Sequence, residues 1–553
     1  MKKLIFLLIF IPGTLFAQSY KQLADSALQV MWTATDTSIL KVYPVSYALY
    51  QKAFALYPQQ IDVVGLYKAG VIAGELGKKD EAFNYLSRAV DKGFYQIVTD
   101  KNAKEEFNKL VNDTRWSDLV KKGKQKERAF LDSLKADQQQ LEDQGILHRL
   151  KLDKYDAKGA YRQIRNYDQY PAISKKLISM QFAFNDALHM AFLIVLPANY
   201  DPHRSYSLLF FLHGAVSMNT GYIDHLDDWD TQGWNRFYTK YAHEVIMVYP
   251  HGNADYNWMY PDKGFYMVPA ILKQIKQVIH VDDDRVFISG HSNGATGSFS
   301  YLMKQPSPFA AFYGFNTRPR VATRGTYIRN ILNRSYFNVS TDQDYYYPPE
   351  ANDSLTVTMK NIGADYQDHR YNGFPHWFPK FDESEAAHKL LFEDLAKRKR
   401  NPFHPNIYWE CDDVKYGRCD WLQITALDTS AARAPWQKNI NFKINKWIVL
   451  DDKDKAHVRD TALTAFKYHK SSGAVKAAYH QNTFTIETSD VKSFSLLISP
   501  EMVDLSQLIT VMVNGKMYLR MKLDYDKDFM IADFKNNLDR SAIWINHIDV
   551  TLP

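Results

Sequence analysis

The pattern of apolar and polar positions changes twice along the chain. From Tyr20 to about residue 124, small and aromatic residues recur at helical spacing, and a charged stretch of helical period continues to Tyr170. Short apolar runs then alternate with helical segments up to about residue 400. After Asn401 the pattern becomes short alternating strands separated by turn signals. The chain is therefore expected to contain an all-helical region, a mixed α/β region and a mostly β region.

Residues 1–17 have the features of a cleaved secretory signal. A basic pair, Lys2 and Lys3, precedes an apolar run, and Ala17 stands before Gln18. That run is too short to span a bilayer, and no later apolar stretch is long enough. The mature protein is expected to be exported, either periplasmic or secreted, with no membrane span. The net charge of +6 is small for 553 residues, which argues against nucleic acid as a partner.

Residues 18–127 resemble tetratricopeptide repeats in their placement of small residues among aromatic residues and leucines. The matching positions are Ala53 and Pro58 in one repeat and Gly70, Ala73, Gly77, Ala82, Leu86 and Ala89 in the next. Small residues at these positions let paired helices approach closely. The resemblance implies either a binding surface for a protein partner or structural cover for the rest of the chain. Residues 128–173 are predicted to form a helical linker.

The middle region, residues 174–400, has the pattern of a sheet covered by helices. Apolar runs predict strands at 190–196, 207–212, 245–249, 286–289 and 336–339, with helices between them at 267–279 and 354–362. Parallel strands need crossover connections, and these are usually helices. The alternation therefore predicts an α/β fold with a mostly parallel, doubly wound sheet.

The last region, residues 401–553, has the pattern of an antiparallel β domain. Strands are predicted at 406–409, 447–450, 483–488, 493–498, 509–513 and 516–523. The last two are joined by Asn514 and Gly515, a pair typical of a two-residue hairpin turn. The region is therefore predicted to be a β-sandwich without catalytic residues.

Cys411 and Cys419 are the only cysteines in the chain. Turn-forming aspartates and a glycine lie between them, and apolar runs flank both. We expect a hairpin closed by a disulfide, because paired cysteines of an exported protein persist as disulfides. A zinc site is the alternative, but His404 is the only further ligand nearby. The sequence predicts no other metal site and no cofactor.

The run VFISGHSNGATG at 286–297 carries the strongest chemical signal. A β-branched and aromatic run precedes Gly290, Ser292 and Gly294, and small residues that open a helix follow. This is the G-x-S-x-G nucleophile elbow in its strand-turn-helix setting. Ser292 is therefore the candidate nucleophile, because such a turn exposes the hydroxyl for activation by a base. The alternative is a surface serine in a glycine turn.

Residues 177–398 resemble the α/β-hydrolase superfamily, nearest its secreted-esterase and polyhydroxybutyrate-depolymerase-like branch. The resemblance implies a triad in the order serine, acid, histidine, each on a loop after a strand. In STDQDYYYP, the acid of the family stands four residues before the proline, which favours Asp344 over Asp342. The segment YNGFPHWFP supplies His376 in the family's Gly-x-x-His setting. The imidazole would move the serine proton, and the carboxylate would orient the imidazole.

An oxyanion hole requires two backbone N–H donors near the nucleophile. The run LLFFLHGAV ends a strand in a His-Gly pair like that of the family, so the resemblance implies the amide of Ala215 as one donor. The other is the amide of Asn293, the residue after the nucleophile. The side chain of His213 is expected to pack at the strand end. His291 is expected to shape the pocket floor or pack against the sheet.

Aromatic and basic residues gather on the loops expected at the same edge. The aromatic residues are Tyr256, Trp258, Tyr260, Tyr345, Tyr346, Tyr347, Trp377 and Phe378, and they fit either an apolar acyl or alcohol pocket or ordinary packing. Arg318, Arg320 and Arg324 follow the next strand. They are candidates for contact with an acidic substrate group, although a solvated cluster is the commoner arrangement.

Three hypotheses for the function follow. The first is a secreted serine hydrolase that cleaves small or polymeric carboxylic esters. The second is a serine peptidase of the same fold, since both reactions transfer an acyl group to serine. The third is a non-catalytic binding protein built on the repeats and the sandwich. The set of Ser292, Asp344 and His376 favours an enzyme, and the absence of a propeller domain typical of one peptidase branch favours the esterase.

Overall fold

A computed structural model of the chain divides into two compact units, Met1–Leu134 and Lys135–Pro553. The described residues are 19–33, 39–99, 103–185, 188–216, 223–226, 236–259, 264–321, 323–344, 346–347, 349–428, 430, 432–450 and 456–553. The predicted signal at 1–17 lies outside them. Within this described part, no helix is long and apolar enough to cross a membrane.

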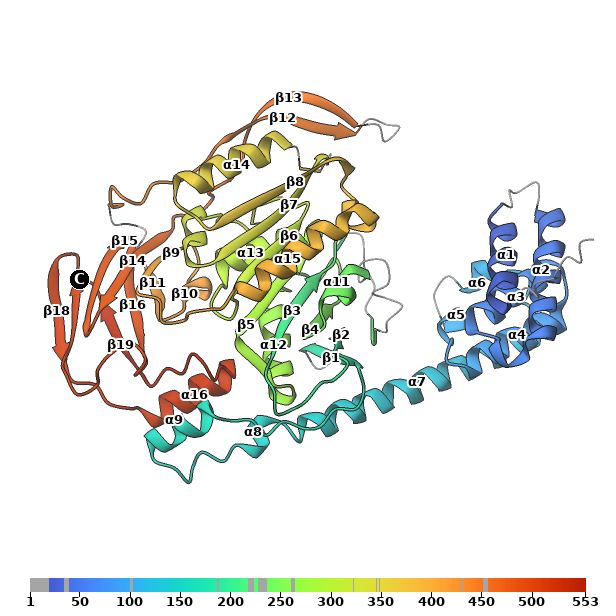
Figure 1. The fold of residues 1–553 in the computed structure, drawn as a ribbon, viewed down its shortest axis with the longest axis horizontal. Helices are drawn as coiled ribbons and strands as arrows, with labels where there is room; N and C mark the ends of the chain where they lie inside the picture. The colour runs from blue at the N-terminus through green and yellow to red at the C-terminus, as the bar shows by residue number, and fades with distance from the viewer. Residues whose placement is uncertain are drawn as a thin grey trace, which may run out of the picture. The chain divides into compact units, whose positions relative to one another are not determined.

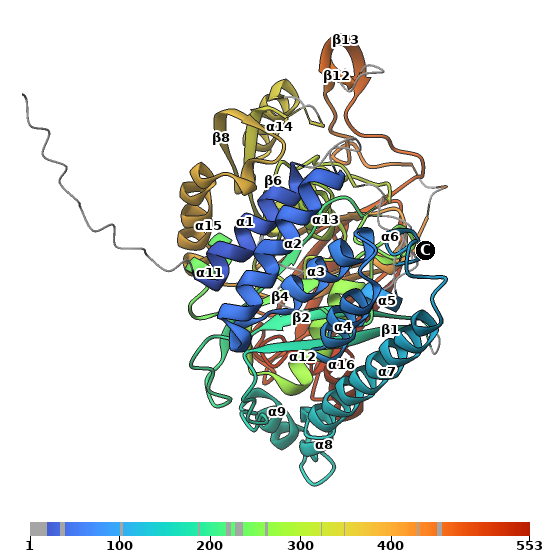
Figure 2. The ribbon, with the colours of Figure 1, turned by 90° about the vertical axis from the view of Figure 1, so that its right-hand side faces the viewer.

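The first unit consists of paired helices. They are α1 (Tyr20–Trp32), α2 (Ile39–Leu56), α3 (Val63–Glu75), α4 (Lys79–Asp91), α5 (Gln96–Thr99), α6 (Ala103–Glu106) and the start of α7 (Thr114–Glu142). Helix α1 packs against α2, and α3 packs against α4 (Figures 1 and 2). A Cβ on Gly70 of α3 would lie 2.7 Å from the Leu86 side chain of α4, so a small residue is required there. The tetratricopeptide assignment itself stays a prediction.

The predicted border between repeats and linker, at residue 127, falls within a single helix. Helix α7 runs for 29 residues through it. Two shorter helices follow, α8 (Ile146–Arg149) and α9 (Ala157–Arg165). Helix α9 packs through Ala160 and Ile164 against Met530 and Phe534 of α16 (Lys527–Asn537). The linker is therefore part of a packed cluster with the carboxyl-terminal segment.

The second unit is built on an eight-stranded sheet in the order β1-β2-β4-β3-β5-β6-β7-β8. The strands are β1 (Leu177–Asn185), β2 (Leu188–Val195), β3 (Tyr206–Leu212), β4 (Val245–Pro250), β5 (Val281–Gly290), β6 (Ala311–Phe315), β7 (Ser335–Gln343) and β8 (Tyr366–Pro375). The pairings β1·β2 and β2·β4 are antiparallel, and the other five are parallel. The predicted mostly parallel sheet is confirmed.

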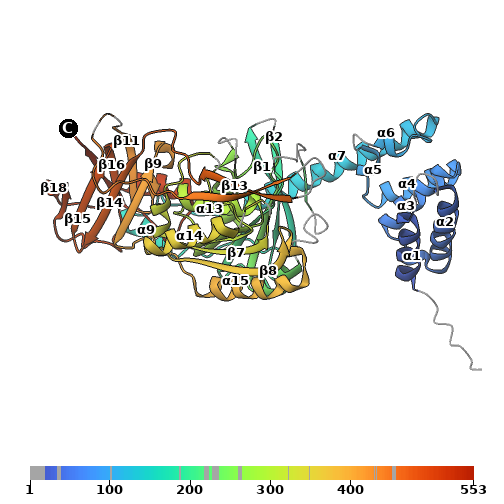
Figure 3. The same cartoon turned by 90° about the horizontal axis from the view of Figure 1, so that it is seen from above.

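Helices cover both faces of this sheet. Successive side chains of a strand point to opposite faces, so Leu208 and Phe210 of β3 belong to one core cluster, and Leu209 and Phe211 belong to another. Helices α12 (Met267–Val278), α13 (Asn293–Lys304) and α14 (Pro349–Asn361) pack in the first cluster, and α11 (Arg236–Tyr241) and α15 (Glu385–Lys397) pack in the second. Figure 3 shows β7 and β8 between α14 and α15. The layers match a doubly wound fold.

The carboxyl-terminal region contains three further sheets, in the orders β18-β17-β15-β14-β9, β10-β11-β16-β19 and β12-β13. The strands are β9 (Asn406–Cys411), β10 (Arg418–Cys419), β11 (Leu422–Leu427), β12 (Lys443–Leu450), β13 (Ala456–Thr464), β14 (Gly473–His480), β15 (Thr483–Ser489), β16 (Val491–Ile498), β17 (Ile509–Val513), β18 (Lys516–Met521) and β19 (Asn546–Thr551). The predicted Asn514-Gly515 hairpin joins β17 to β18 with positive φ at both residues. The sandwich assignment stays a prediction.

The expected hairpin and disulfide between the cysteines are wrong. Cys411 ends β9, which pairs with β14, whereas Cys419 lies in β10, which pairs with β11. The two strands belong to different sheets, and both thiols are free and buried. His404 Nε2 lies 3.0 Å from an oxygen of Asp420, so His404 is a partner of that carboxylate. The turn signal between the cysteines marks a change of sheet.

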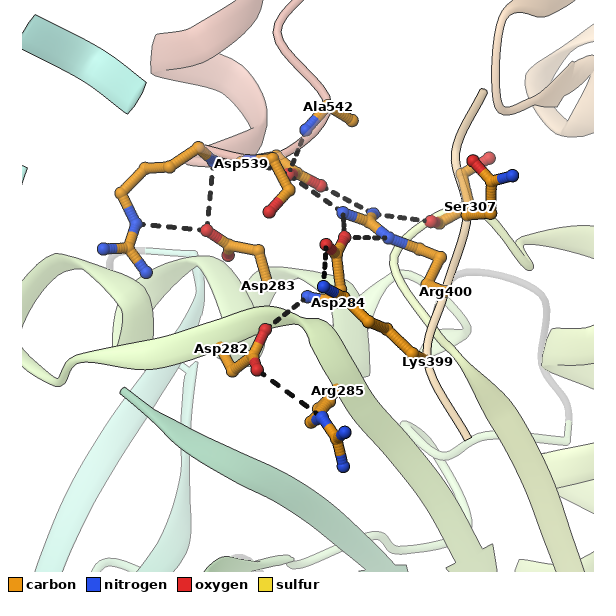
Figure 4. A network of polar contacts seen from close by, with 12 residues as sticks. Asp282, Asp283, Asp284, Arg285, Ser307, Lys399, Arg400, Asp539 and Ala542 are labelled. Carbon is orange, nitrogen blue, oxygen red and sulfur yellow. Dashed lines mark hydrogen bonds and ion pairs between the residues drawn. The ribbon is translucent and has the colours of Figure 1, made fainter. Parts of the chain in front are cut away.

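Buried ion pairs join the carboxyl-terminal segment to the amino end of β5 (Figure 4). Arg400 donates to both oxygens of Asp539, at 2.7 and 3.0 Å, and to Asp284 at 3.1 Å. Asp283 accepts from Arg540 at 3.1 Å and lies 2.6 Å from the ammonium of Lys276. The carboxyl-terminal region and the α/β core therefore share one buried polar interface.

Candidate active site

Ser292 lies in a sharp turn between β5 and α13, with φ 58° and ψ −118°. Such a left-handed backbone is strained for a residue other than glycine. The turn is packed tightly, because a Cβ on Gly294 would lie 1.8 Å from the carbonyl oxygen of Leu212, and one on Gly290 would lie 2.5 Å from the carbonyl carbon of Gly294. These glycines permit the turn, which holds Ser292 half-buried at the carboxyl end of β5.

His376 and Asp344 form a buried pair on neighbouring loops. Asp344 follows β7 and His376 follows β8, and these strands are adjacent in the sheet. The imidazole Nδ1 lies 2.9 Å from Asp344 Oδ2, and the two side chains are 2% and 3% exposed. Contact with a carboxylate at Nδ1 places the proton there, which leaves Nε2 as the basic nitrogen. The structure thus brings two of the three predicted triad residues into direct contact.

His291 connects the serine turn to the histidine loop. Its Nε2 lies 2.7 Å from the backbone carbonyl oxygen of His376, so Nε2 carries the proton and donates. Burial, and then the neighbouring His376, lower the pKa of His291 to about 3, so it is neutral at any working pH. The residue before Ser292 therefore fixes the backbone of His376. From the sequence, His291 was expected to shape the pocket floor or pack against the sheet, because a histidine next to the serine carries no signal for a partner that lies far along the chain.

Asp344 is held by neutral donors. Its Oδ1 accepts from the backbone N–H of Tyr346 at 2.8 Å and of Tyr347 at 3.3 Å, and its Oδ2 also accepts from Asn316 Nδ2 at 2.9 Å. Asn316 directly follows β6 and has φ 55°. Sequence reasoning missed Asn316, although a polar residue at the end of a fully apolar strand was a usable signal.

Asp342, the rejected alternative for the acid, has a different role. Its Oδ1 accepts from the backbone N–H of Gly373 at 2.7 Å, in an exposed position. Gly373 has φ 88°, which favours glycine. Asp342 thus stabilises the turn that leads to His376. Among the hydrogen bonds of the described residues, none joins Asp342 to the imidazole of His376.

The candidate oxyanion donors lie on both sides of Ser292. Asn293 is the first residue of α13, where backbone N–H groups have no partner within the helix. On the other side, a Cβ on Gly214 would lie 3.0 Å from the Cβ of Ser292, so this backbone segment passes directly against the serine. Ala215 follows with φ 56°. The geometry brings both predicted donors next to the serine turn.

His213 orients the peptide that carries the Ala215 amide. Its Nε2 accepts from the backbone N–H of Gly252 at 3.0 Å, so the ring proton is on Nδ1, which donates to the Gly214 carbonyl oxygen at 2.7 Å. Burial lowers the pKa of His213, which keeps the ring neutral. In a trans peptide the N–H points away from the C=O, so this bond directs the Ala215 N–H away from His213. The packing role expected for this side chain was incomplete.

The predicted aromatic pocket is only partly formed. Tyr346 and Trp377 are 47% and 40% exposed, and their rings lie 4.4 and 5.3 Å from that of His376. Trp258, Tyr347 and Phe378 are buried and pack in the core. Tyr260 and Tyr345 lie outside the described residues. Among the described residues, Tyr346 and Trp377 are therefore the exposed aromatic side chains whose rings lie beside that of His376.

No family model matches the chain. Among solved structures, it is similar to a thermostable esterase (19% identity, TM-score 0.34, 41% of this chain and 64% of that one) and a ferulic acid esterase (18%, 0.32, 40% and 96%). A Thermogutta terrifontis esterase 2 phosphoramylated by tabun is also similar (13%, 0.33, 41% and 97%). The matched part thus spans less than two thirds of the thermostable esterase. At these values the strand order and the site geometry of this chain carry the functional argument.

The arrangement can perform acyl transfer with side chains and backbone alone. A serine in a strained turn, an imidazole oriented by a carboxylate and two backbone donors are the parts that this chemistry uses. Within the described residues, no group of three or more His, Cys, Asp or Glu side chains could hold a metal ion.

Proposed function

We propose that the chain is a serine hydrolase that cleaves carboxylic esters through an acyl-enzyme, with Ser292 as nucleophile, His376 as base and Asp344 as its orienting acid. The observation that carries the proposal is the strained turn at Ser292 next to the buried His376–Asp344 pair. Backbone strain of this kind persists only where surrounding packing maintains it, and it is common at active sites.

The proposed reaction has two halves. His376 Nε2 takes the proton of the Ser292 hydroxyl as the serine oxygen attacks the ester carbonyl. The tetrahedral intermediate collapses, His376 gives that proton to the departing alkoxide, and the acyl group remains on Ser292. Water then attacks the acyl carbon, its proton passes to His376 and on to the serine oxygen, and the carboxylic acid leaves.

Backbone donors supply the stabilisation of the intermediate. The amides of Ala215 and Asn293 flank Ser292, and we assign them to the oxyanion that forms on the former carbonyl oxygen. Among the described residues, the imidazole of His376 is the one ion-pair partner of Asp344, so the charge of Asp344 serves the imidazolium formed in each half-reaction. Loss of one oxyanion donor typically costs about 3 kcal/mol of barrier.

The test is a substrate panel on the mature chain. We expect turnover of 4-nitrophenyl acetate and butyrate and covalent labelling of Ser292 by a fluorophosphonate probe. Peptide 4-nitroanilides are included because the same site could transfer an acyl group from an amide. Faster turnover of the anilides than of the esters would make the protein a peptidase. The absence of both ester turnover and labelling of Ser292 would overturn the proposal.

The proposals for the rest of the chain come from the sequence. Residues 1–17 would direct export and be removed, which leaves Gln18 as the first residue of the mature protein. The helical region at 18–127 would offer a surface to a protein partner. Amino-terminal sequencing of exported protein tests the first, since an intact Met1 would contradict it.

A further inference from the structure

Two cations lie on indole rings beside the candidate triad. The Arg318 guanidinium lies 4.8 Å from the ring centroid of Trp447, and the Lys380 ammonium lies 5.5 Å from that of Trp377. Trp377 contacts the rings of both His291 and His376, at 5.7 and 5.3 Å. Lys380 also contributes to the low pKa of His291, after burial and His376, which places its charge near the triad. The rim of the site is therefore both aromatic and positive.

Arg318 is tied to the catalytic elements through its backbone. Its N–H donates to Thr296 Oγ1 at 3.3 Å, and the N–H of Thr296 in turn donates to the carbonyl oxygen of Ser292 at 3.0 Å. Arg318 also lies two residues after Asn316, which binds Asp344. Its backbone is thus fixed one helical turn from the nucleophile, while its guanidinium reaches solvent.

The charge of Arg318 has no carboxylate partner among the described residues. Neither Arg318 nor its neighbour Arg320 takes part in an ion pair there, in contrast to the Arg400 interface. The pKa of Arg318 is lowered by burial and then by the positive charge of Arg320. Two acids of α14, the helix that packs against β12, have other partners: Glu350 lies 3.9 Å from Lys446, and Asp353 lies 2.9 Å from Arg370. Two like charges therefore stand together without compensation.

Trp447 reaches this rim from a distant part of the chain. It lies in β12, which pairs with β13 and packs against α14 (Figure 1). Stacking on an indole holds a guanidinium flat while its N–H groups stay directed outward in the ring plane. The hairpin thus orders Arg318 without consuming its hydrogen-bond donors.

We propose that Arg318, ordered by Trp447, binds a carboxylate on the ester substrate, so that the preferred substrates are anionic esters. The inference rests on the proposed esterase function and specifies its substrate class. A guanidinium presents two parallel N–H donors that match a carboxylate. Because Arg318 lies near a second positive charge, that of Arg320, and has no carboxylate partner among the described residues, an anionic ligand gains from the attraction of both charges. Tyr346 and Trp377 would cover the apolar part of the same substrate.

The test compares esters that differ only in one charge. In the first pair, 4-acetoxybenzoate and 4-acetoxybenzamide, the charge is on the alcohol side of the ester. In the second pair, methyl 4-carboxybenzoate and methyl 4-carbamoylbenzoate, the charge is on the acyl side. We expect kcat/KM to favour the carboxylate by about tenfold in at least one pair, and salt to weaken this preference. No preference in either pair would overturn the inference.

Variants show whether Arg318 is responsible. Arg318→Gln should reduce the ratio of kcat/KM between the carboxylate ester and its carboxamide counterpart to about one, and Arg318→Lys should retain part of the preference. Trp447→Leu should give an intermediate value. The matched control is Lys516→Gln, which removes one exposed positive charge on β18 and should leave the preference unchanged. An unchanged preference in Arg318→Gln would assign the charge recognition elsewhere.

A binding measurement separates this inference from the proposed function. In Ser292→Ala, calorimetry should show tighter binding of benzoate than of benzamide, and the added Arg318→Gln change should remove the difference. If no ester is turned over, the esterase proposal fails, yet the calorimetry still tests the anion site. If neutral esters are turned over through Ser292 without a charge preference and benzoate does not bind, only the anion site fails.

Discussion

Two buried aspartates in the second unit show that the fold treats the charge at the candidate active site differently from the charge at a structural interface. Asp539 at the interface receives two hydrogen bonds from the Arg400 guanidinium, whose charge cancels its own. Asp344 at the candidate active site is held by an amide side chain, by backbone N–H groups and by His376. No lysine or arginine of the described residues forms an ion pair with Asp344.

The difference shows how the negative charge of a buried carboxylate can be kept available to act on a neighbouring imidazole. A permanent counter-charge would neutralise Asp344 and leave little field for the imidazolium that the proposed mechanism forms on His376. Neutral donors satisfy the lone pairs and preserve the net charge. At the interface nothing needs to change during a reaction cycle, so full compensation is the stable solution for charges out of water.

The largest effect is expected at the nucleophile and base. Ser292→Ala and His376→Ala should each lower kcat for 4-nitrophenyl acetate by roughly 10⁵-fold, and the double variant should fall no further, because triad residues act as a unit. The melting temperature of Ser292→Ala should stay close to that of the wild type. Burst and steady-state kinetics measure the loss. A single variant that keeps most of its activity would remove that residue from the mechanism.

The next largest effect should separate the two aspartates after β7. Asp344→Asn should lower kcat by about 10⁴-fold, because the amide favours the wrong imidazole tautomer and carries no charge for the imidazolium. Asp342→Asn is the matched control and should lower kcat by less than about threefold, since its amide oxygen can still accept a hydrogen bond from the N–H of Gly373. Steady-state rates of both variants measure the difference. The reverse ranking would place the acid two residues earlier.

At the interface the effect should appear in stability. Arg400→Leu removes the guanidinium that pairs with the buried Asp539 and with Asp284, so the free energy of unfolding should fall by about 3–5 kcal/mol. Lys399→Gln, next to it and 61% exposed, should change it by less than about 0.5 kcal/mol. Denaturant unfolding measures both. Equal stability of the two variants would mean that the interface contributes little.

A smaller effect concerns pH. Burial alone would raise the pKa of Asp539, but attraction to Arg400 outweighs it and holds the pKa well below the usual value near 4. A depressed folded pKa adds stability that is present above about pH 4 and is lost as pH falls through the folded value. In Arg400→Leu the buried carboxyl should take its proton at higher pH. The difference in melting temperature between wild type and variant should therefore narrow from pH 7 to pH 4, and a constant gap would contradict this origin.

Local pattern predicted the α/β core well and long-range contacts poorly. The run 286–289 lies in the buried carboxyl-terminal half of β5, and the glycines after it fit a sharp turn, so both the strand and the turn could be predicted from the sequence. The spacing of the acid from Pro348 selected Asp344, which is the aspartate that contacts His376. Trp447 lies about 130 residues after Arg318, and no period or spacing links them. The prediction of a hairpin between the two cysteines was wrong for the same reason, because a turn signal does not identify the strand with which each flanking strand pairs.

The smallest effect is expected at the two cysteines, which lie in the carboxyl-terminal sheets and not at the catalytic edge. Burial, and then the nearby Asp412, raise the pKa of Cys411 to about 12, and burial raises the pKa of Cys419 as well. At pH 8 only about one Cys411 thiol in 10⁴ would be a thiolate, the form that reacts. Native protein should therefore react slowly with a thiol reagent, whereas denatured, unreduced protein should show two thiols per chain. Reductant should change neither ester turnover nor the melting temperature. A denatured sample with no free thiols, together with a loss of stability on reduction, would show that the strands bearing these cysteines rearrange to form a bridge.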